Sequence, residues 1–114
     1  MNVRSAKAKG RRLQNKVRDF LRTTFPILHD DDIKSQTMGM AGEDIVLSPS
    51  ARDLIPYSFE CKNVERLQFW ATVEQAESNI KKDTYPAIVV KKNRKSPYVA
   101  IQLEHFLELI GGKE

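Results

Sequence analysis

The sequence predicts an α/β domain in which a mixed β-sheet carries α-helices on its faces. Two observations favour this class. The predicted elements follow the order helix, strands, helix, strands, helix, and the chain of 114 residues has the length of one domain. Hydrophobic residues make up 40% of the sequence, which suffices for a modest core, and no internal repeat or linker divides it.

The N-terminal segment predicts a basic arm that leads into an amphipathic helix. We expect residues 1–8 to form a flexible basic arm and residues 9–114 to form a single domain. The helix should begin near Lys9 and end at about Arg22, before the helix-breaking Pro26. Four apolar residues at helical spacing form its buried stripe: Leu13, Val17, Phe20 and Leu21.

The next stretch predicts a turn, a short strand and a loop. Residues 29–32 end in consecutive acids, which cannot all face one ion, so a turn or helix cap is favoured over a metal cluster. A short strand is expected over residues 33–37. The loop 38–42 holds two glycines that permit unusual backbone angles, and it leads to Asp44.

Two short strands form the predicted centre of the domain. The first runs from Asp44 to Leu47, and the second covers residues 57–63, after a helical turn at residues 51–54. The simplest arrangement pairs these strands as a hairpin. That pairing would bring Asp44 close to Glu60.

The C-terminal half predicts two helices and two strands. A helix is expected over residues 65–82, a buried strand over 86–90, a basic loop at 91–95, a strand over 98–103 and a closing helix over 104–110. The buried stripe of the first of these helices should be Phe69, Val73, Ala76 and Ile80.

Charge and cysteine content narrow the class of partner. The formal net charge is +4, but residues 1–22 carry +7 and the remainder carries −3. A basic segment on a mildly acidic body favours a polyanionic partner, whereas the alternative is a solvated segment that maintains solubility. One cysteine excludes an intrachain disulfide and fits the cytoplasm. No stretch resembles a membrane span or a signal peptide, so no membrane partner is expected.

The chemistry of the predicted centre lies on the second strand. Side chains alternate along a strand, so Glu60 and Lys62 share one face while Cys61 points to the other. With Asp44 nearby, two carboxylates and the Cys61 carbonyl could supply the oxygen ligands that Mg²⁺ prefers. Lys62 could orient or deprotonate a water molecule or offset negative charge, so the constellation predicts phosphodiester hydrolysis.

Each of these residues also has a plainer interpretation. Alternating charges on an edge strand often serve solubility alone. Three observations argue for chemistry here: the upstream acid Asp44, the apolar residues that alternate with Glu60 and Lys62, and the basic segment. By alternation, Cys61 is expected to be a core thiol and not a nucleophile. Trp70 could pack within the chain or meet a partner chain, and packing is the favoured interpretation. His105 is expected to be structural.

The motifs resemble those of a known family. Residues 42–44 together with 60–62 resemble the PD-(D/E)xK nuclease superfamily, most of all archaeal Holliday-junction resolvases and small phage nucleases of that type. Residues 9–14 resemble the Lys-Gly opening of the resolvase N-terminal helix. Residues 74–75 resemble its glutamine-bearing helix, and residues 86–93 resemble the buried strand with a basic end.

The resemblance implies a restriction-endonuclease-like fold and a set of site residues. Asp44 and Glu60 would be metal ligands and Lys62 the catalytic lysine, with Mg²⁺ as cofactor and Mn²⁺ as a substitute. Gln14 stands where the resolvases have a glutamate that assists the metal, and the alternative for it is a surface residue beside the stripe. Ser35 and Gln75 match supporting residues of the family, and for both the alternative is a local hydrogen bond. Glu43 stands where the family name has proline.

The predicted function is therefore that of a metal-dependent DNA endonuclease, resolvase-like, acting on branched DNA as a homodimer. The alternatives are a duplex or nicking phage or homing endonuclease of the same superfamily, and a non-catalytic DNA-binding module of this fold. For a phage protein the location would be the host cytoplasm. The cations expected to contact DNA phosphates are Lys7, Lys9, Arg11, Arg12, Lys91, Lys92, Arg94 and Lys95.

Overall fold

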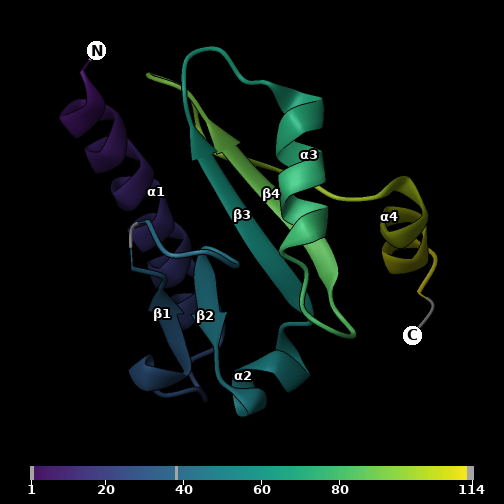
Figure 1. The fold of residues 1–114 in the computed structure, drawn as a ribbon. Helices are drawn as coiled ribbons and strands as arrows, with labels where there is room; N and C mark the ends of the chain where they lie inside the picture. Colours follow the sequence, from purple (N-terminus) through teal and green to yellow (C-terminus); the bar gives the residue numbers. More distant parts are fainter. Residues whose placement is uncertain (1, 38, 113–114) are drawn as a thin grey trace.

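A computed structural model describes residues 2–37 and 39–112 as an α/β fold with mixed sheets flanked by helices (Figure 1). In chain order the elements are α1 (Val3–Thr24), η1 (Asp30–Asp32), β1 (Ile33–Ser35), β2 (Ile45–Leu47), α2 (Pro49–Leu54), β3 (Tyr57–Asn63), α3 (Phe69–Ser78), β4 (Tyr85–Lys91), β5 (Tyr98–Ala100) and α4 (Leu103–Ile110). This order confirms the predicted alternation of helices and strands.

The strands form two sheets, and their pairing differs from the predicted hairpin. β1 pairs antiparallel with β2, whereas β3 pairs parallel with β4, which pairs antiparallel with β5. The predicted hairpin between residues 44–47 and 57–63 is therefore wrong. The reason is that α3 crosses over between β3 and β4, as a parallel pair requires, and β2 finds its partner in the strand before it.

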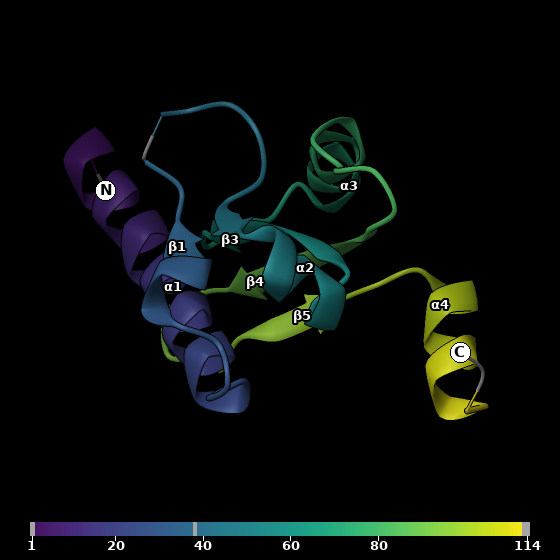
Figure 2. The same cartoon turned by 90° about the horizontal axis from the view of Figure 1, so that it is seen from below.

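Helices α1 and α3 lie on either side of β3. α1 packs against β1 and β3, and α3 packs against β3 and β4. Figure 2 shows α3 on one side of the β3–β4–β5 sheet and α4 standing off to the side. The largest fully buried side chains, Leu13, Ile33 and Ile45, join α1 to the β1–β2 sheet. This core holds the N-terminal helix against the strand that carries Glu60.

The ends of several elements differ from the predicted ones. α1 begins at Val3, because the side chain of Asn2 caps it by accepting a hydrogen bond from the Ser5 N–H at 2.8 Å. Residues 3–8, predicted as a flexible arm, are thus helical. α3 is shorter than predicted, with Thr72 and Ala76 buried and Ile80 exposed, and the strand predicted over 98–103 ends at Ala100.

The structure confirms the predicted turn at residues 30–32 and the unusual glycine angles in the loop before Asp44, of which residue 38 lies outside the described residues. Residues 30–32 form a single turn of 3₁₀ helix, and Asp32 accepts a hydrogen bond from the Ser48 hydroxyl at 2.6 Å. Gly39 and Gly42 adopt φ angles of +86° and +106°. Those angles favour glycine, and they allow the loop to deliver Asp44 to the edge of β3.

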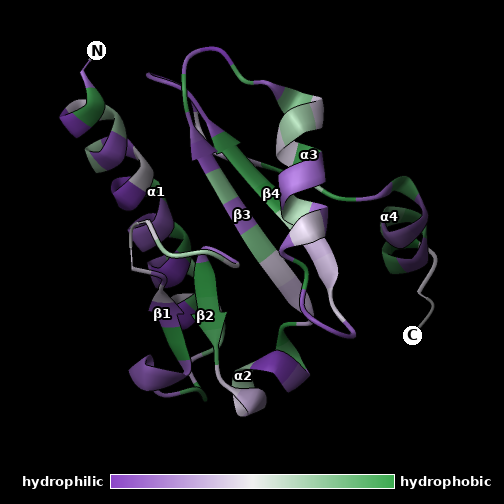
Figure 3. Cartoon of the chain, viewed as in Figure 1, coloured by the Kyte–Doolittle hydropathy of each residue, from purple (hydrophilic) through white to green (hydrophobic). Residues whose placement is uncertain are grey.

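Hydrophobic residues are concentrated on β2 and β4, but α4 also carries many of them (Figure 3). In β4, Ala87, Ile88 and Val89 are buried, which confirms the predicted buried strand. No helix within the described residues combines the length and the apolar character needed to cross a membrane.

Candidate active site

A pocket of about 240 Å³ lies between α1, the loop before β2, the C-terminal end of β3 and α3. It brings together six of the residues singled out from the sequence: Gln14, Asp44, Glu60, Cys61, Lys62 and Gln75. These residues come from four separate segments of the chain. Their convergence is a property of the fold that no single motif contains.

Asp44 reaches the pocket without strand pairing between β2 and β3. Its backbone N–H donates to the Phe59 carbonyl at 2.9 Å, and its Oδ2 accepts from the Cys61 N–H at 2.6 Å. Asp44 is thus fixed along the edge of β3 that β4 does not occupy. The predicted proximity of Asp44 to Glu60 is present, although the hairpin that motivated it is not.

Glu60 and Lys62 share the face of β3 that α3 covers. Glu60 is only 3% exposed, and its Oε1 is buried without a hydrogen-bond partner. Lys62 is half-buried and close enough for its charge to act on both Asp44 and Glu60. A buried carboxylate oxygen with no donor is costly, so a bound cation would relieve it.

The pKa values of Asp44 and Glu60 are both raised. Burial raises the pKa of Asp44, and the Cys61 N–H and the Lys62 charge only partly oppose this shift. Burial and the negative charge of Asp44 raise the pKa of Glu60 to about 7. Such perturbed, adjacent carboxyl groups are typical of sites that bind cations or transfer protons.

Gln14 faces the pocket and is not a surface residue. It is 7% exposed, and its Oε1 is buried without a hydrogen-bond partner. Asn63 Oδ1 is unpartnered in the same way at another wall of the pocket. The pocket thus contains several oxygen acceptors and too few donors, which fits a hard cation. Within residues 2–37 and 39–112, however, no three His, Cys, Asp or Glu side chains form a metal-binding group.

Cys61 contributes its backbone and not its thiol. Its side chain is 8% exposed, and burial raises the pKa of the thiol far above its ordinary value, so the sulfur stays protonated. Because the N–H of Cys61 points toward Asp44, its carbonyl points to the same edge of β3. That carbonyl is the oxygen considered as a third ligand.

Gln75 and Ser35 differ in their positions. Gln75, on α3, lines the pocket. The Ser35 hydroxyl instead donates to Asn15 Oδ1 at 2.8 Å, and Ser35 does not line the pocket. The local hydrogen bond therefore describes Ser35 better than a place beside the metal does.

Lys9 differs from its prediction as a DNA contact. It is 4% exposed, and its Nζ donates to Glu65 Oε2 at 2.9 Å. The same oxygen accepts from the Asn93 N–H at 2.8 Å. Glu65 therefore ties α1 to the turn after β4, next to the pocket wall at Asn63. The sequence offered no signal for this link, because its members lie far apart in the chain.

Glu43 was also more important structurally than its sequence position indicated. It is 3% exposed and forms an ion pair with Arg52 of α2. Arg52 also donates to the Tyr57 carbonyl at 3.1 Å. The pair anchors the residue before Asp44 to the start of β3, which helps to hold Asp44 in place.

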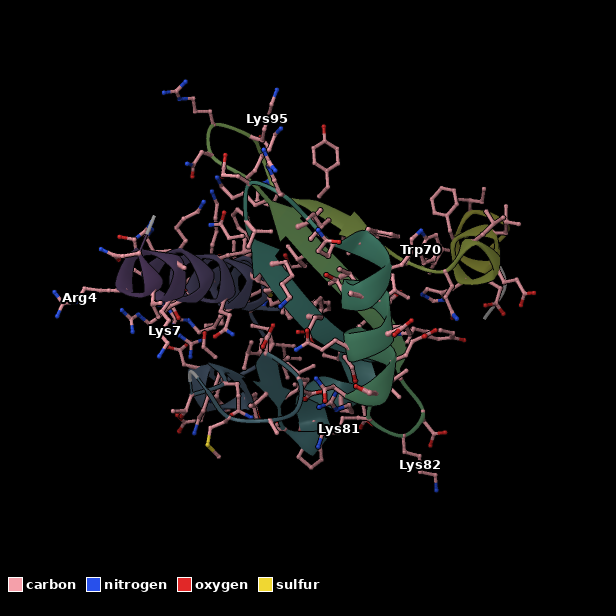
Figure 4. All side chains as sticks on the ribbon, turned by 45° about the horizontal axis from the view of Figure 1, so that its top comes forward. Arg4, Lys7, Trp70, Lys81, Lys82 and Lys95 are labelled. Atoms are coloured by element: carbon pink, nitrogen blue, oxygen red, sulfur yellow. The ribbon has the colours of Figure 1, made fainter. Side chains whose placement is uncertain are left out.

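The other cations predicted to contact DNA project from the surface. Lys7 extends from the N-terminal half of α1 and Lys95 from the turn after β4, and Figure 4 shows them far apart on the molecule. Arg4, Lys81 and Lys82 project in the same view and were not among the predicted contacts. Apart from the half-buried Lys91, the predicted set other than Lys9 is exposed: Lys7, Arg11, Arg12, Lys92, Arg94 and Lys95.

Comparisons with known proteins identify no relative. No protein-family model, no curated protein and no solved structure matches the chain. Arguments about its function therefore depend on the geometry of the pocket and on the sequence motifs.

Proposed function

We propose that the chain is a Mg²⁺-dependent DNA endonuclease with a restriction-endonuclease-like fold, acting on branched DNA. The observation that carries the proposal is the meeting of Asp44, Glu60 and Lys62 in one pocket that holds unpartnered oxygen atoms. The sequence resemblance supplies the reaction class. The geometry supplies a site in which that reaction is chemically reasonable.

The residues present fit a divalent cation with oxygen ligands. Asp44 and Glu60 would each supply a carboxylate oxygen, and the Cys61 carbonyl and the Gln14 amide oxygen are the neutral donors at hand. The chemistry that a bound Mg²⁺ supplies is polarisation of a phosphoryl oxygen and acidification of a water molecule.

Lys62 is the candidate for orienting the attacking water and for neutralising negative charge on the phosphate. Lys62 lines the pocket and its charge acts on both carboxylates, so it can donate a hydrogen bond to an attacking water or to a phosphate oxygen. A positive charge there offsets the negative charge that develops as the phosphodiester bond breaks. Gln75, which lines the pocket from α3, can orient the water through its amide.

DNA is the proposed substrate because exposed cations extend from two parts of the molecule, the N-terminal end of α1 and the turn after β4. Lys7 at the end of α1 and Lys95 in the turn after β4 can contact phosphates that flank a scissile bond. The preference for branched DNA and the homodimer follow from the resemblance. The same geometry also suits a duplex or nicking endonuclease, and the substrate panel below separates the two.

A second candidate function is non-catalytic DNA binding. The observation that favours it is Gln14, since a neutral amide is a weaker cation ligand than the glutamate of the resolvases. Lys62 and the two carboxylates argue for catalysis, because a binding module has no need of a buried carboxyl group whose pKa is raised to about 7.

The test is a cleavage assay with matched variants. Purified protein would be incubated with Mg²⁺ or Mn²⁺ and end-labelled four-way junction, nicked duplex, linear duplex and single-stranded DNA. We expect cleavage of the junction, a loss of at least about 100-fold for Glu60→Gln and Lys62→Met, and no cleavage in excess EDTA.

Binding to the same DNA serves as the control. Glu60→Gln and Lys62→Met should bind the junction nearly as well as the parent chain, since the basic residues that contact phosphates are elsewhere. An inactive parent chain that binds DNA would establish the non-catalytic module. Variants that cleave like the parent chain would remove these residues from the mechanism.

A further inference from the structure

Helix α4 carries its apolar stripe on the side that faces solvent. The stripe has helical spacing and consists of Leu103, Phe106, Leu107 and Ile110, which are 46–70% exposed. The helix packs instead through His105, which is 6% exposed and stacks on Tyr85 with ring centroids 3.7 Å apart. In an ordinary amphipathic helix the apolar stripe would be the buried side.

An apolar groove continues the stripe toward α3. The groove has a volume of about 340 Å³, and Leu103 lines it together with Phe69, Trp70 and Val73. Trp70 is 74% exposed, against the prediction that it packs on its helix, and Figure 4 shows it on the side of α3 that faces α4. Because Leu103 belongs to both, the stripe and the groove form one surface, named here the α3–α4 surface.

The charges around the α3–α4 surface exclude DNA as its partner. Glu77 lines the groove, and Glu104 and Glu108 flank the stripe on α4. Acidic side chains repel phosphates, and an apolar helix face offers a polyanion nothing to bind. The surface therefore fits another protein surface of apolar character.

The size of the surface identifies the kind of protein partner. From the exposed fractions, the stripe and Trp70 present roughly 700 Å² per chain, which exceeds the usual apolar patch of a monomer. A standard specific interface buries about 800 Å² on each side. The chain also carries both a protruding apolar helix and an apolar groove, which is what a two-fold symmetric contact requires.

We propose that a second copy of this chain covers the α3–α4 surface, with the α4 stripe of each protomer seated in the α3–α4 groove of its partner. Trp70 and Ile110 of opposite protomers meet in this arrangement. A homodimer is already implied by the resemblance, and the new inference is the surface through which the two copies meet. Because that surface uses none of the pocket residues, it can fail without the nuclease proposal failing. It also leaves the pocket open, since Gln75 lines the pocket from α3 while Trp70 points to the groove.

The first measurement is the mass of the chain in solution as a function of concentration. Sedimentation velocity should show a dimer that dissociates on dilution. Trp70 is the single tryptophan, so its emission maximum should shift to shorter wavelength as the dimer forms, in step with the mass. A chain that stays monomeric into the high micromolar range overturns the proposal.

Charged variants locate the interface. Ile110→Glu and Trp70→Glu should each raise the dimer dissociation constant at least about 30-fold, since they place a charge in an apolar contact. Both positions are exposed, so the fold should persist by circular dichroism. The matched control is Ile27→Glu, at a site 80% exposed and outside the surface, which should leave the dimer intact. A dimer unaffected by both interface variants contradicts the proposal.

A mixing experiment tests the helix-in-groove geometry directly. Trp70→Cys and Ile110→Cys proteins, prepared separately and mixed under mild oxidation, should form the mixed disulfide dimer faster than either forms its own. The native Cys61 is buried and should not compete. Faster self-pairing of Ile110→Cys would indicate helix-on-helix contact and would overturn the proposed seating.

Discussion

Helix α3 separates two surfaces that depart from ordinary packing in opposite ways. On the side of α1, Glu60 and Gln14 are polar and buried, with oxygen atoms that lack donors. On the side of α4, Trp70 and Ile110 are apolar and exposed. Each departure from ordinary packing costs stability in the isolated chain. A bound cation would remove the cost on the α1 side, and an apolar partner would remove it on the α4 side.

The largest expected effect contrasts a core leucine with an exposed one. Leu13→Ala should lower the free energy of unfolding by about 3 kcal/mol, because Leu13 is 1% exposed and its loss leaves a cavity. Leu107→Ala, at 50% exposure, should change the monomer by less than about 0.5 kcal/mol. Urea unfolding of dilute protein measures both. Similar losses for the two would mean that α4 is packed within its own chain.

The second effect is the stabilisation of the folded chain by Glu60→Gln, which depends on pH. The pKa of Glu60 is about 7 in the folded chain against an ordinary 4.5, so the folded state holds the proton more tightly. The free energy of unfolding therefore falls as pH rises from about 4.5 to 7, and the loss is complete above pH 7. Without metal, Glu60→Gln should be more stable than the parent chain by about 2 kcal/mol at pH 8, after allowance for solvent screening.

Two controls accompany that measurement. At about pH 3 Glu60→Gln and the parent chain should be nearly equal, because Glu60 is then protonated in both the folded and the unfolded state. Glu65→Gln should behave in the opposite sense and destabilise the chain at pH 8, because hydrogen bonding to the Asn93 N–H and to Lys9 lowers the pKa of Glu65. A pH-independent effect of Glu60→Gln would mean that its carboxyl group is ordinary.

The sequence predicted the site residues better than it predicted how the chain brings them together. The alternation along residues 57–63 correctly placed Glu60 and Lys62 on one face, because side-chain direction on a strand is a local property. The pairing was wrong, because which strands become neighbours depends on α3 and the β1–β2 sheet. Asp44 reaches β3 through hydrogen bonds to Phe59 and Cys61, and no spacing rule encodes them.

Burial of polar groups was the least predictable feature. Lys9 was counted with the free cations, yet it is buried against Glu65, a partner 56 residues away. The sequence left Gln14 between the surface and the site, and the structure buries it in the pocket lining. The apolar residues of α4 recur at helical spacing in the sequence. That spacing does not distinguish an apolar side that faces the core from one that faces a partner.

The smallest expected effect separates free cations from the buried one. Lys7→Ala should reduce the slope of log affinity for DNA against log salt by about 0.9, which is the loss of one phosphate contact. Lys9→Met should leave that slope unchanged, because its ammonium is engaged by Glu65. Fluorescence anisotropy with labelled junction DNA over a salt series measures both. An equal loss for Lys9→Met would restore Lys9 to the DNA-binding set.

The most direct test of the account is calorimetric titration of the metal-free protein with Mn²⁺ at pH 8. The account predicts one or more ions bound per chain, loss of binding in Glu60→Gln, and at least about tenfold tighter binding in Gln14→Glu, which adds a carboxylate at the unpartnered amide. Equal binding by the parent chain and Glu60→Gln, or none by Gln14→Glu, would contradict the claim that this pocket holds a cation.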